Sequence, residues 1–208
     1  MEPSHEPSDV RVSVTVAAPP ERAFDLFTNG FGEWWMPEYT WSGPLALSRI
    51  GIEPREGGLC HEIGPYGFRV DWGRVLTWAP PDRVVFTWQI SPERVPEPDP
   101  LRASEVEVLF TPEGAGTRVE LIHRGFDRHG DGAQAYRGGM SVGWQQLIGR
   151  YAATAATAGT AGTAGTAATA ATAATAATSA TARTEHASRS VKPDKYGSGL
   201  PGTAGLDL

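Results

Sequence analysis

The sequence predicts an α+β domain in which an antiparallel sheet wraps around one long C-terminal helix. Short strand patterns follow one another with turn residues between them, which favours an antiparallel meander because parallel crossovers need a dozen or more residues. One long amphipathic helix pattern comes last, so the sheet must bury a face against it. The 7 tryptophans recur along this region and indicate an aromatic-lined interior.

The domain is predicted to open with a strand and a short helix. In Val10–Val16, valines alternate with polar residues, the pattern of a half-buried strand. Pro20 and Glu21 suit the first turn of a helix, and Gly30 follows its apolar stripe. The adjacent pair Trp34 and Trp35 comes next. Because two neighbours cannot both face one side of a regular element, we expect one to fill the core and the other to line a surface or cavity.

Further strand patterns are separated by clusters of glycine and proline. They cover Leu45–Ile52, Gly58–Ile63, Phe68–Thr77, Arg83–Ile90, Ser104–Thr111 and Thr117–Arg124. The proline-rich segment 91–100 is long for a hairpin connection. It is either a mobile lid over a pocket or, as we favour, an ordinary surface loop.

The last helix is predicted from Asp131 or Gln134 to Tyr151. Its apolar stripe consists of Met140, Trp144, Leu147, Ile148 and Tyr151. From Ala152 the chain repeats Thr-Ala-Ala or Thr-Ala-Gly, and a period of three matches no packed helix face. We therefore predict a disordered tail over 1–8, one domain over 9–151, and a low-complexity tail over 152–208 that is disordered or transiently helical.

Composition excludes several function classes. The net charge of −6 argues against nucleic acid and against anionic lipid surfaces, which demand a basic face. Cys60 is the only cysteine, so neither an intrachain disulfide nor a thiolate metal cluster is expected. The acidic, proline-containing start lacks a signal-peptide pattern and no apolar run approaches 18 residues, so we expect a cytoplasmic protein.

Several short motifs occur in one order over nearly the whole non-repetitive chain. They are Pro20–Phe24, Trp34, Trp35, Pro37, Glu56–Gly58, Gly73–Val75, Pro80–Trp88, Gly116–His123, Gly143 and Trp144. On these residues the region 9–151 resembles the START-related, polyketide cyclase-like superfamily, and within it the bacterial homologues of the heat-shock ATPase activator. The resemblance implies a helix-grip fold, with the sheet curled around the C-terminal helix and a deep, mostly apolar cavity inside. The resemblance implies less about function than about fold, because the superfamily includes lipid carriers, cyclases, receptors and chaperone regulators.

The predicted cavity takes its lining from the inward rows of the strands and the last helix. We expect an apolar or aromatic ligand there, although plain core packing is the more common role for such side chains. The predicted ligand-binding residues are Trp35, Trp72, Trp88, His123, Met140 and Trp144.

Few residues offer acid–base chemistry. His123 sits at the inner end of an apolar row, where it either acts as a general acid or base or, as we favour, is held by local hydrogen bonds. Glu62 and Asp71, facing each other across a hairpin, and Arg74, on the same face as Trp72, are weaker candidates. No metal-ligand spacing or phosphate loop is present, so no metal and no cofactor are expected.

Three functions remain open from the sequence. The favoured one is binding of an apolar or aromatic small molecule, which needs only the cavity. The second is a cyclase or dehydratase enzyme with pocket acids and bases. The third is a chaperone-regulatory module of the stress response that docks on a protein partner through an exposed apolar patch or forms a homodimer.

Overall fold

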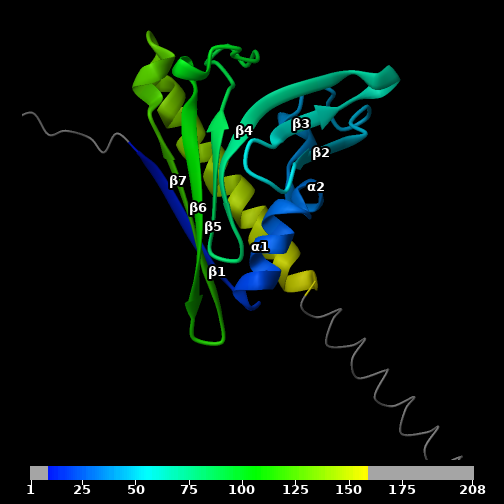
Figure 1. Ribbon diagram of the computed structural model, residues 1–208, viewed down its shortest axis with the longest axis vertical. Coiled ribbons are helices and arrows are strands. Elements are labelled where there is room, and N and C mark those ends of the chain that lie inside the picture. Colours follow the sequence, from blue (N-terminus) through cyan, green and yellow to red (C-terminus); the bar gives the residue numbers. More distant parts are fainter. Residues whose placement is uncertain (1–8, 159–208) are drawn as a thin grey trace, which may run out of the picture. The chain divides into compact units, whose positions relative to one another are not determined.

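The computed structural model describes residues 9–158, which form a seven-stranded antiparallel sheet and three helices (Figure 1). The strand order is β1-β7-β6-β5-β4-β3-β2. The strands are β1 (Val10–Val16), β2 (Arg49–Ile52), β3 (Leu59–Ile63), β4 (Arg69–Ala79), β5 (Arg83–Trp88), β6 (Ser104–Glu113) and β7 (Gly116–Arg124). The helices are α1 (Pro20–Thr28), α2 (Phe31–Trp34) and a C-terminal helix over 133–158, and the short turns η1 (Pro37–Tyr39) and η4 (Phe126–His129) also matter below.

The curled sheet holds the C-terminal helix against its concave face (Figure 1). Trp144, Leu147, Ile148 and Tyr151 on this helix are all buried, as the apolar stripe predicts. The Tyr151 hydroxyl donates a hydrogen bond of 2.8 Å to the Ala23 carbonyl, which fastens the helix to α1. The predicted α+β helix-grip architecture is confirmed.

Each predicted strand exists, with some shifted ends. β2 begins only at Arg49, because the preceding residues form a turn in which Leu45 is fully exposed. The C-terminal helix continues past Tyr151 to 158, and Ala155 is buried in the core. Small alanines of the first repeats thus extend the packed face of the helix. Segments 1–8 and 159–208, which include most of the predicted tails, lie outside the described residues.

Trp34 and Trp35 are both buried, so neither lines the surface, whereas the lining of an interior cavity by one of them stays a prediction. Trp34 is the last residue of α2, whereas Trp35 has extended backbone angles of −62° and 145°. The helix therefore ends between them, and this change of direction lets both side chains turn inward. Sequence periodicity predicts the direction of side chains only within one continuous helix or strand.

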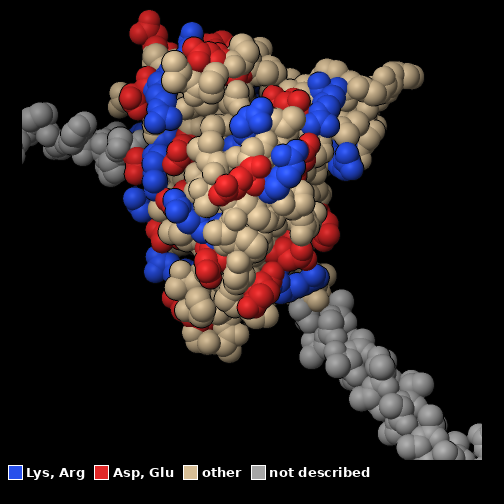
Figure 2. Space-filling model, in the orientation of Figure 1, with Lys and Arg blue, Asp and Glu red and all other residues tan. Residues whose placement is uncertain are grey.

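The visible surface carries acidic and basic side chains interspersed rather than a patch of one sign (Figure 2). Ion pairs connect neighbouring strands, including Arg124 on β7 with Glu107 on β6 at 2.7 Å and Arg11 on β1 with Glu120 on β7 at 3.6 Å. Within residues 9–158, no helix is long and apolar enough to cross a membrane.

Candidate functional site

The interior between sheet and C-terminal helix is a continuous aromatic cluster. Trp35 lies at its centre, stacked on Phe31 with ring centroids 4.8 Å apart and on Trp72 at 6.0 Å. Trp88 and Trp144 complete it, with centroids 5.3 Å from each other. The residues predicted to line a cavity are thus brought together, including His123 and the partly buried Met140. Their rings contact one another directly.

One half of this cluster has all its polar atoms paired, and His123 is its centre. The Trp144 indole Nε1–H donates to His123 Nδ1 at 3.0 Å, so that nitrogen is the unprotonated one. His123 Nε2 then carries the proton and donates to Ser104 Oγ at 2.7 Å. Ser104 Oγ lies 2.8 Å from His129 Nε2 on η4, to which it donates in turn. We call Trp144, His123, Ser104 and His129 the histidine network.

Burial keeps the histidine network neutral. It lowers the pKa of His123 to about 3, with the neighbouring His129 acting in the same direction. Burial also lowers the pKa of His129. Because both ring nitrogens of His123 are engaged, proton transfer to a ligand would require the network to open. The geometry instead fixes Trp144, η4 and β6 to one another.

The other half of the cluster holds two indole N–H groups with no acceptor. Trp35 Nε1 and Trp72 Nε1 are buried and have no hydrogen-bond partner in the described part of the chain. Their neighbours differ, since Trp34 Nε1 donates to the Phe27 carbonyl at 3.3 Å and Trp88 Nε1 to the Tyr136 hydroxyl at 2.8 Å. We call Trp35 and Trp72 the unpaired tryptophans. Sequence patterns reveal their burial but not whether an acceptor lies in reach.

Two segments that we call the cover, 37–47 and 91–99, connect to each other and to the C-terminal helix. Trp41 Nε1 donates to the Arg94 carbonyl at 2.9 Å, and the Arg94 guanidinium lies 5.9 Å from the centre of the Tyr39 ring. The Tyr39 hydroxyl donates to Gln146 on the helix. Tyr39 and Trp41 also pack on the hydrophobic core. The cover begins just after Trp35. Besides these contacts, the backbone N–H groups of Trp41 and Ser42 donate to the Glu62 carboxylate, and Glu97 forms an ion pair with Arg102.

The remaining acid–base candidates do not converge on the cluster. Glu62 is buried, and its carboxylate accepts backbone hydrogen bonds from Trp41 at 3.0 Å and Ser42 at 2.7 Å. Glu62 pairs in register with Val70, so Asp71, the next residue along β4, points to the opposite face. The expectation that Glu62 and Asp71 face each other is therefore wrong.

Arg74 also departs from the prediction. It is exposed and donates to the Gly57 carbonyl at 2.8 Å, whereas Trp72 points inward. The pairing of β4 with β3 shifts between Cys60 and His61, which pair with Gly73 and Asp71 and leave Trp72 as an extra residue. Beyond this shift, Val75 rather than Arg74 is buried. A strict period of two does not survive such an irregularity.

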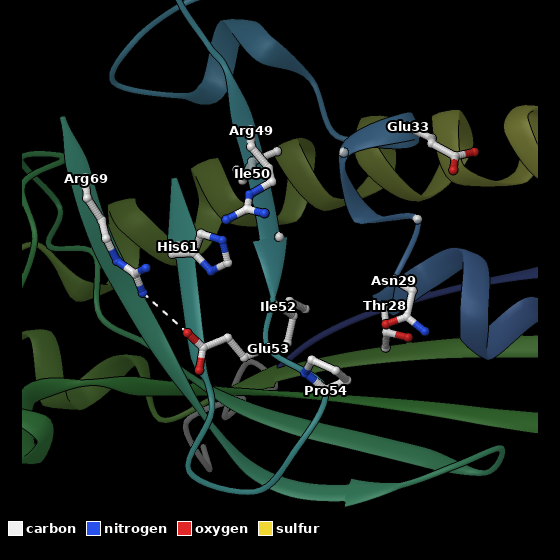
Figure 3. Close-up of a pocket in the computed structure, with 13 residues that line it drawn as sticks. Thr28, Asn29, Glu33, Arg49, Ile50, Ile52, Glu53, Pro54, His61 and Arg69 are labelled. Carbon is white, nitrogen blue, oxygen red and sulfur yellow. Dashed lines mark hydrogen bonds and ion pairs between the residues drawn. The ribbon is translucent and has the colours of Figure 1, made fainter. Parts of the chain in front are cut away.

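A surface pocket of about 460 Å³ lies apart from the aromatic cluster, where α1 and α2 meet the edge of the sheet (Figure 3). Among its lining residues are Arg49 and Gly51 on β2, His61 on β3 and Arg69 on β4. None of the sequence-predicted site residues lines it. The only available sequence signal was a glycine between charged positions of an edge strand, which is too weak to predict a site.

Comparisons with known proteins agree with this fold. Residues 17–156 match the family model described as activator of Hsp90 ATPase homolog 1-like protein. A solved structure described as an anthrahydroquino-gamma-pyrone synthase, Txn09, complexed with SUM is 38% identical, with 72% of this chain and 97% of that chain covered and a TM-score of 0.52. Protein MLL2253 from Mesorhizobium loti is 23% identical, with 70% and 95% covered and a TM-score of 0.50. Protein NE0264 from Nitrosomonas europaea is 16% identical, with 71% and 93% covered and a TM-score of 0.50. No curated protein matches the chain.

Proposed function

The chain belongs to the activator of Hsp90 ATPase homolog 1-like protein family, and we propose that it binds a planar polycyclic aromatic molecule that carries carbonyl or hydroxyl oxygens. The ligand lies against the unpaired tryptophans and accepts hydrogen bonds from their N–H groups. Flat rings suit this surface, because Trp35, Phe31 and Trp72 already stack on one another.

The observation that carries the proposal is the pair of buried N–H groups without acceptors. A buried donor left unpaired costs about 1–3 kcal/mol, and most such groups in native proteins have a partner. Two of them in one cluster therefore point to an acceptor supplied from outside the chain. A ligand oxygen meets this need in an interior that is otherwise apolar.

The relative at 38% identity supports the ligand class. Its description names an anthrahydroquino-gamma-pyrone product, which is a fused planar ring system bearing oxygens. Since this chain covers 97% of that protein, the similarity extends over the whole of its fold. We infer that the ligand of this chain is of the same polycyclic, oxygenated type.

The ligand reaches the cluster when the cover opens. The interior is filled by its own rings, so binding requires Trp35 to shift, and the cover continues directly from Trp35. The polar contacts that close the cover, such as Trp41 to Arg94, are exposed or half-buried. A neutral contact of this kind contributes about 0.5–1.5 kcal/mol, and each of the two bonds to the Glu62 carboxylate about 1.5–3 kcal/mol. A ligand that buries a large aromatic surface offsets their loss.

The test uses 1,8-dihydroxyanthraquinone, with anthracene as a probe that has the same rings but no oxygen. The indole N–H resonances of the 7 tryptophans are assigned with single Trp→Phe variants and followed by NMR during titration. We expect the Trp35 and Trp72 resonances to move downfield with the quinone while that of Trp34 stays. Two new hydrogen bonds predict roughly ten-fold tighter binding of the quinone than of anthracene. Equal affinities, or shifts that avoid both unpaired tryptophans, contradict the proposal.

A second candidate function is ring closure, because the similar protein is described as a synthase. The same two N–H groups would then stabilise negative charge that develops on a substrate oxygen. A suitable substrate is 1-(2-hydroxyphenyl)butane-1,3-dione, whose phenol oxygen adds to the distal carbonyl with loss of water to give 2-methylchromone. Catalysis predicts chromone formation above the rate in buffer, and a strong loss of rate in Trp72→Phe. A rate equal to that in buffer removes this candidate.

A chaperone-regulatory role, a homodimer and a cytoplasmic location stay predictions. The proposed ligand site does not require any of them.

A further inference from the structure

The surface pocket in Figure 3 gathers polar side chains from three neighbouring strands. Arg49 on β2 and Arg69 on β4 both pair in register with Ile63 of β3, so they flank one position of that strand. His61 points to the same face two residues earlier and pairs with Gly51. Both arginines are therefore diagonal neighbours of His61, within reach of long side chains.

His61 carries an unpartnered polar atom. The residue is only 7% exposed, and its Nε2 has no hydrogen-bond partner in the described part of the chain. Its Nδ1 makes one long contact of 3.4 Å with the Leu59 carbonyl. Because that contact is weak, the ring can carry its proton on Nε2 at little cost. A buried imidazole nitrogen that lacks a partner and lines a pocket indicates a ligand.

Of the two arginines beside His61, only one has a carboxylate in direct contact. Arg69 is neutralised, since its guanidinium contacts Asp71 at 2.8 Å and Glu53 at 3.4 Å, and the hydrogen bond to Asp71 raises its pKa. Arg49 makes no ion pair or hydrogen bond to any residue within 9–158. In Figure 3 its side chain reaches from β2 toward the His61 ring. The pocket thus offers an unpaired guanidinium beside an unpaired imidazole, and the Glu33 carboxylate on α2 also lines it.

The shape of the pocket adds room and an apolar wall. Gly51 has no side chain, and a Cβ at that position would lie 3.9 Å from His61 Cε1. The glycine therefore places no side chain of its own against the imidazole, although His61 is only 7% exposed. Ile52 and Pro54 also line the pocket, and its volume of about 460 Å³ exceeds what a bare ion needs.

We propose that this pocket binds a small monocarboxylate, with the carboxylate between Arg49 and His61 and the apolar part against Ile52 and Pro54. One unpaired guanidinium matches one carboxylate, whereas a phosphate dianion would be repelled more strongly by the carboxylates of Glu33, Glu53 and Asp71. Arginine and an N–H donor are suited to a carboxylate because both donate to its oxygens. The site is separate from the aromatic cluster and does not depend on the function proposed for it.

The test titrates the full chain with cyclohexanecarboxylate and, in parallel, with the neutral cyclohexanecarboxamide. Calorimetry gives the affinities, and the His61 ring resonances, assigned with His61→Gln, report the place of binding. We expect the carboxylate to bind about ten-fold more tightly than the amide, since charge-assisted hydrogen bonds are the strong ones. The His61 resonances should shift and those of the Trp35 and Trp72 indoles should not. Equal affinities, or shifts at the tryptophans alone, overturn the proposal.

Two variants localise the effect. Arg49→Gln should weaken carboxylate binding about ten-fold, whereas Arg118→Gln on β7, an exposed arginine outside the pocket, should not change it. Gly51→Val places a β-branched side chain over His61 on an edge strand that accepts it, and should abolish binding while the melting temperature is kept. Undiminished binding in folded Gly51→Val or Arg49→Gln protein contradicts the site.

Discussion

The two halves of the aromatic cluster are built from the same residue type and differ in their hydrogen bonds. Trp144 donates to His123, and the bonds continue through Ser104 to His129. Trp35 and Trp72, in the other half, donate to nothing in the described part of the chain. Packing alone does not explain this difference, because both halves are buried. The comparison indicates that one half holds the fold together and the other is available to a ligand.

The positions of the two halves fit these roles. The histidine network joins the C-terminal helix, β7, β6 and η4, elements that are distant in sequence and must be fixed together. Trp35 lies where α2 ends, just before the cover, and Trp72 on β4 stacks on it. This second region is covered by loops and short turns, so we expect the interior to open there.

The largest expected effect comes from making the same substitution in each half. Trp144→Phe and Trp72→Phe remove similar volumes from sites that are 0% and 2% exposed. Trp144→Phe also leaves the buried Nδ1 of His123 without a donor, whereas Trp72→Phe removes an N–H that has no partner. We therefore expect Trp144→Phe to lower the free energy of unfolding by about 1–3 kcal/mol more than Trp72→Phe does.

Urea denaturation of both variants measures this difference. A variant with Trp34→Phe serves as a control, because Trp34 is buried and has an acceptor of its own in the Phe27 carbonyl. Its free energy of unfolding should fall by an amount similar to that of Trp144→Phe, because both variants lose a hydrogen bond. Equal losses for Trp144→Phe and Trp72→Phe would show that hydrogen bonding does not distinguish the two halves.

The sequence predicts the fold well because the fold depends on periodicity and turns. The alternation in Val10–Val16 and the stripe ending at Tyr151 report directly which side chains face the core. The same reasoning fails at Trp35, where a helix ends, and at Arg74, which follows the register shift between β3 and β4. Local irregularities of this kind are set by tertiary packing, so the periodicity of the sequence does not predict them.

The candidate sites are less predictable for a related reason. Burial of Trp72 and His123 follows from strand parity, but the partner of a polar atom depends on residues far away in the chain. Ser104 and Trp144, which engage both nitrogens of His123, come from β6 and the C-terminal helix. No sequence pattern singles out His61, and its place in a pocket appears only when β2 lies beside β3.

A smaller effect is expected from acid, and it again separates the two halves. In the folded protein the pKa of His123 lies at about 3, whereas an unfolded histidine titrates near 6.5. Between these values the unfolded state binds more protons, so the stability that is fully present above pH 6.5 is lost as the pH falls toward 3. From pH 6.5 to 5.0, His123 alone predicts a loss of about 1.5 kcal/mol.

Removing the titrating group isolates this contribution. His123→Phe should be less stable than the native protein at pH 7 and should lose part of the pH dependence between 6.5 and 5.0, while His129, whose pKa burial also lowers, retains its own part. Trp72→Phe should keep the full pH dependence, since no titrating group bonds to Trp72 in the described residues. If His123→Phe and Trp72→Phe show the same slope of unfolding free energy against pH, His123 is not held neutral by the fold. The hydrogen bonds of the histidine network would then not explain the difference between the two halves of the cluster.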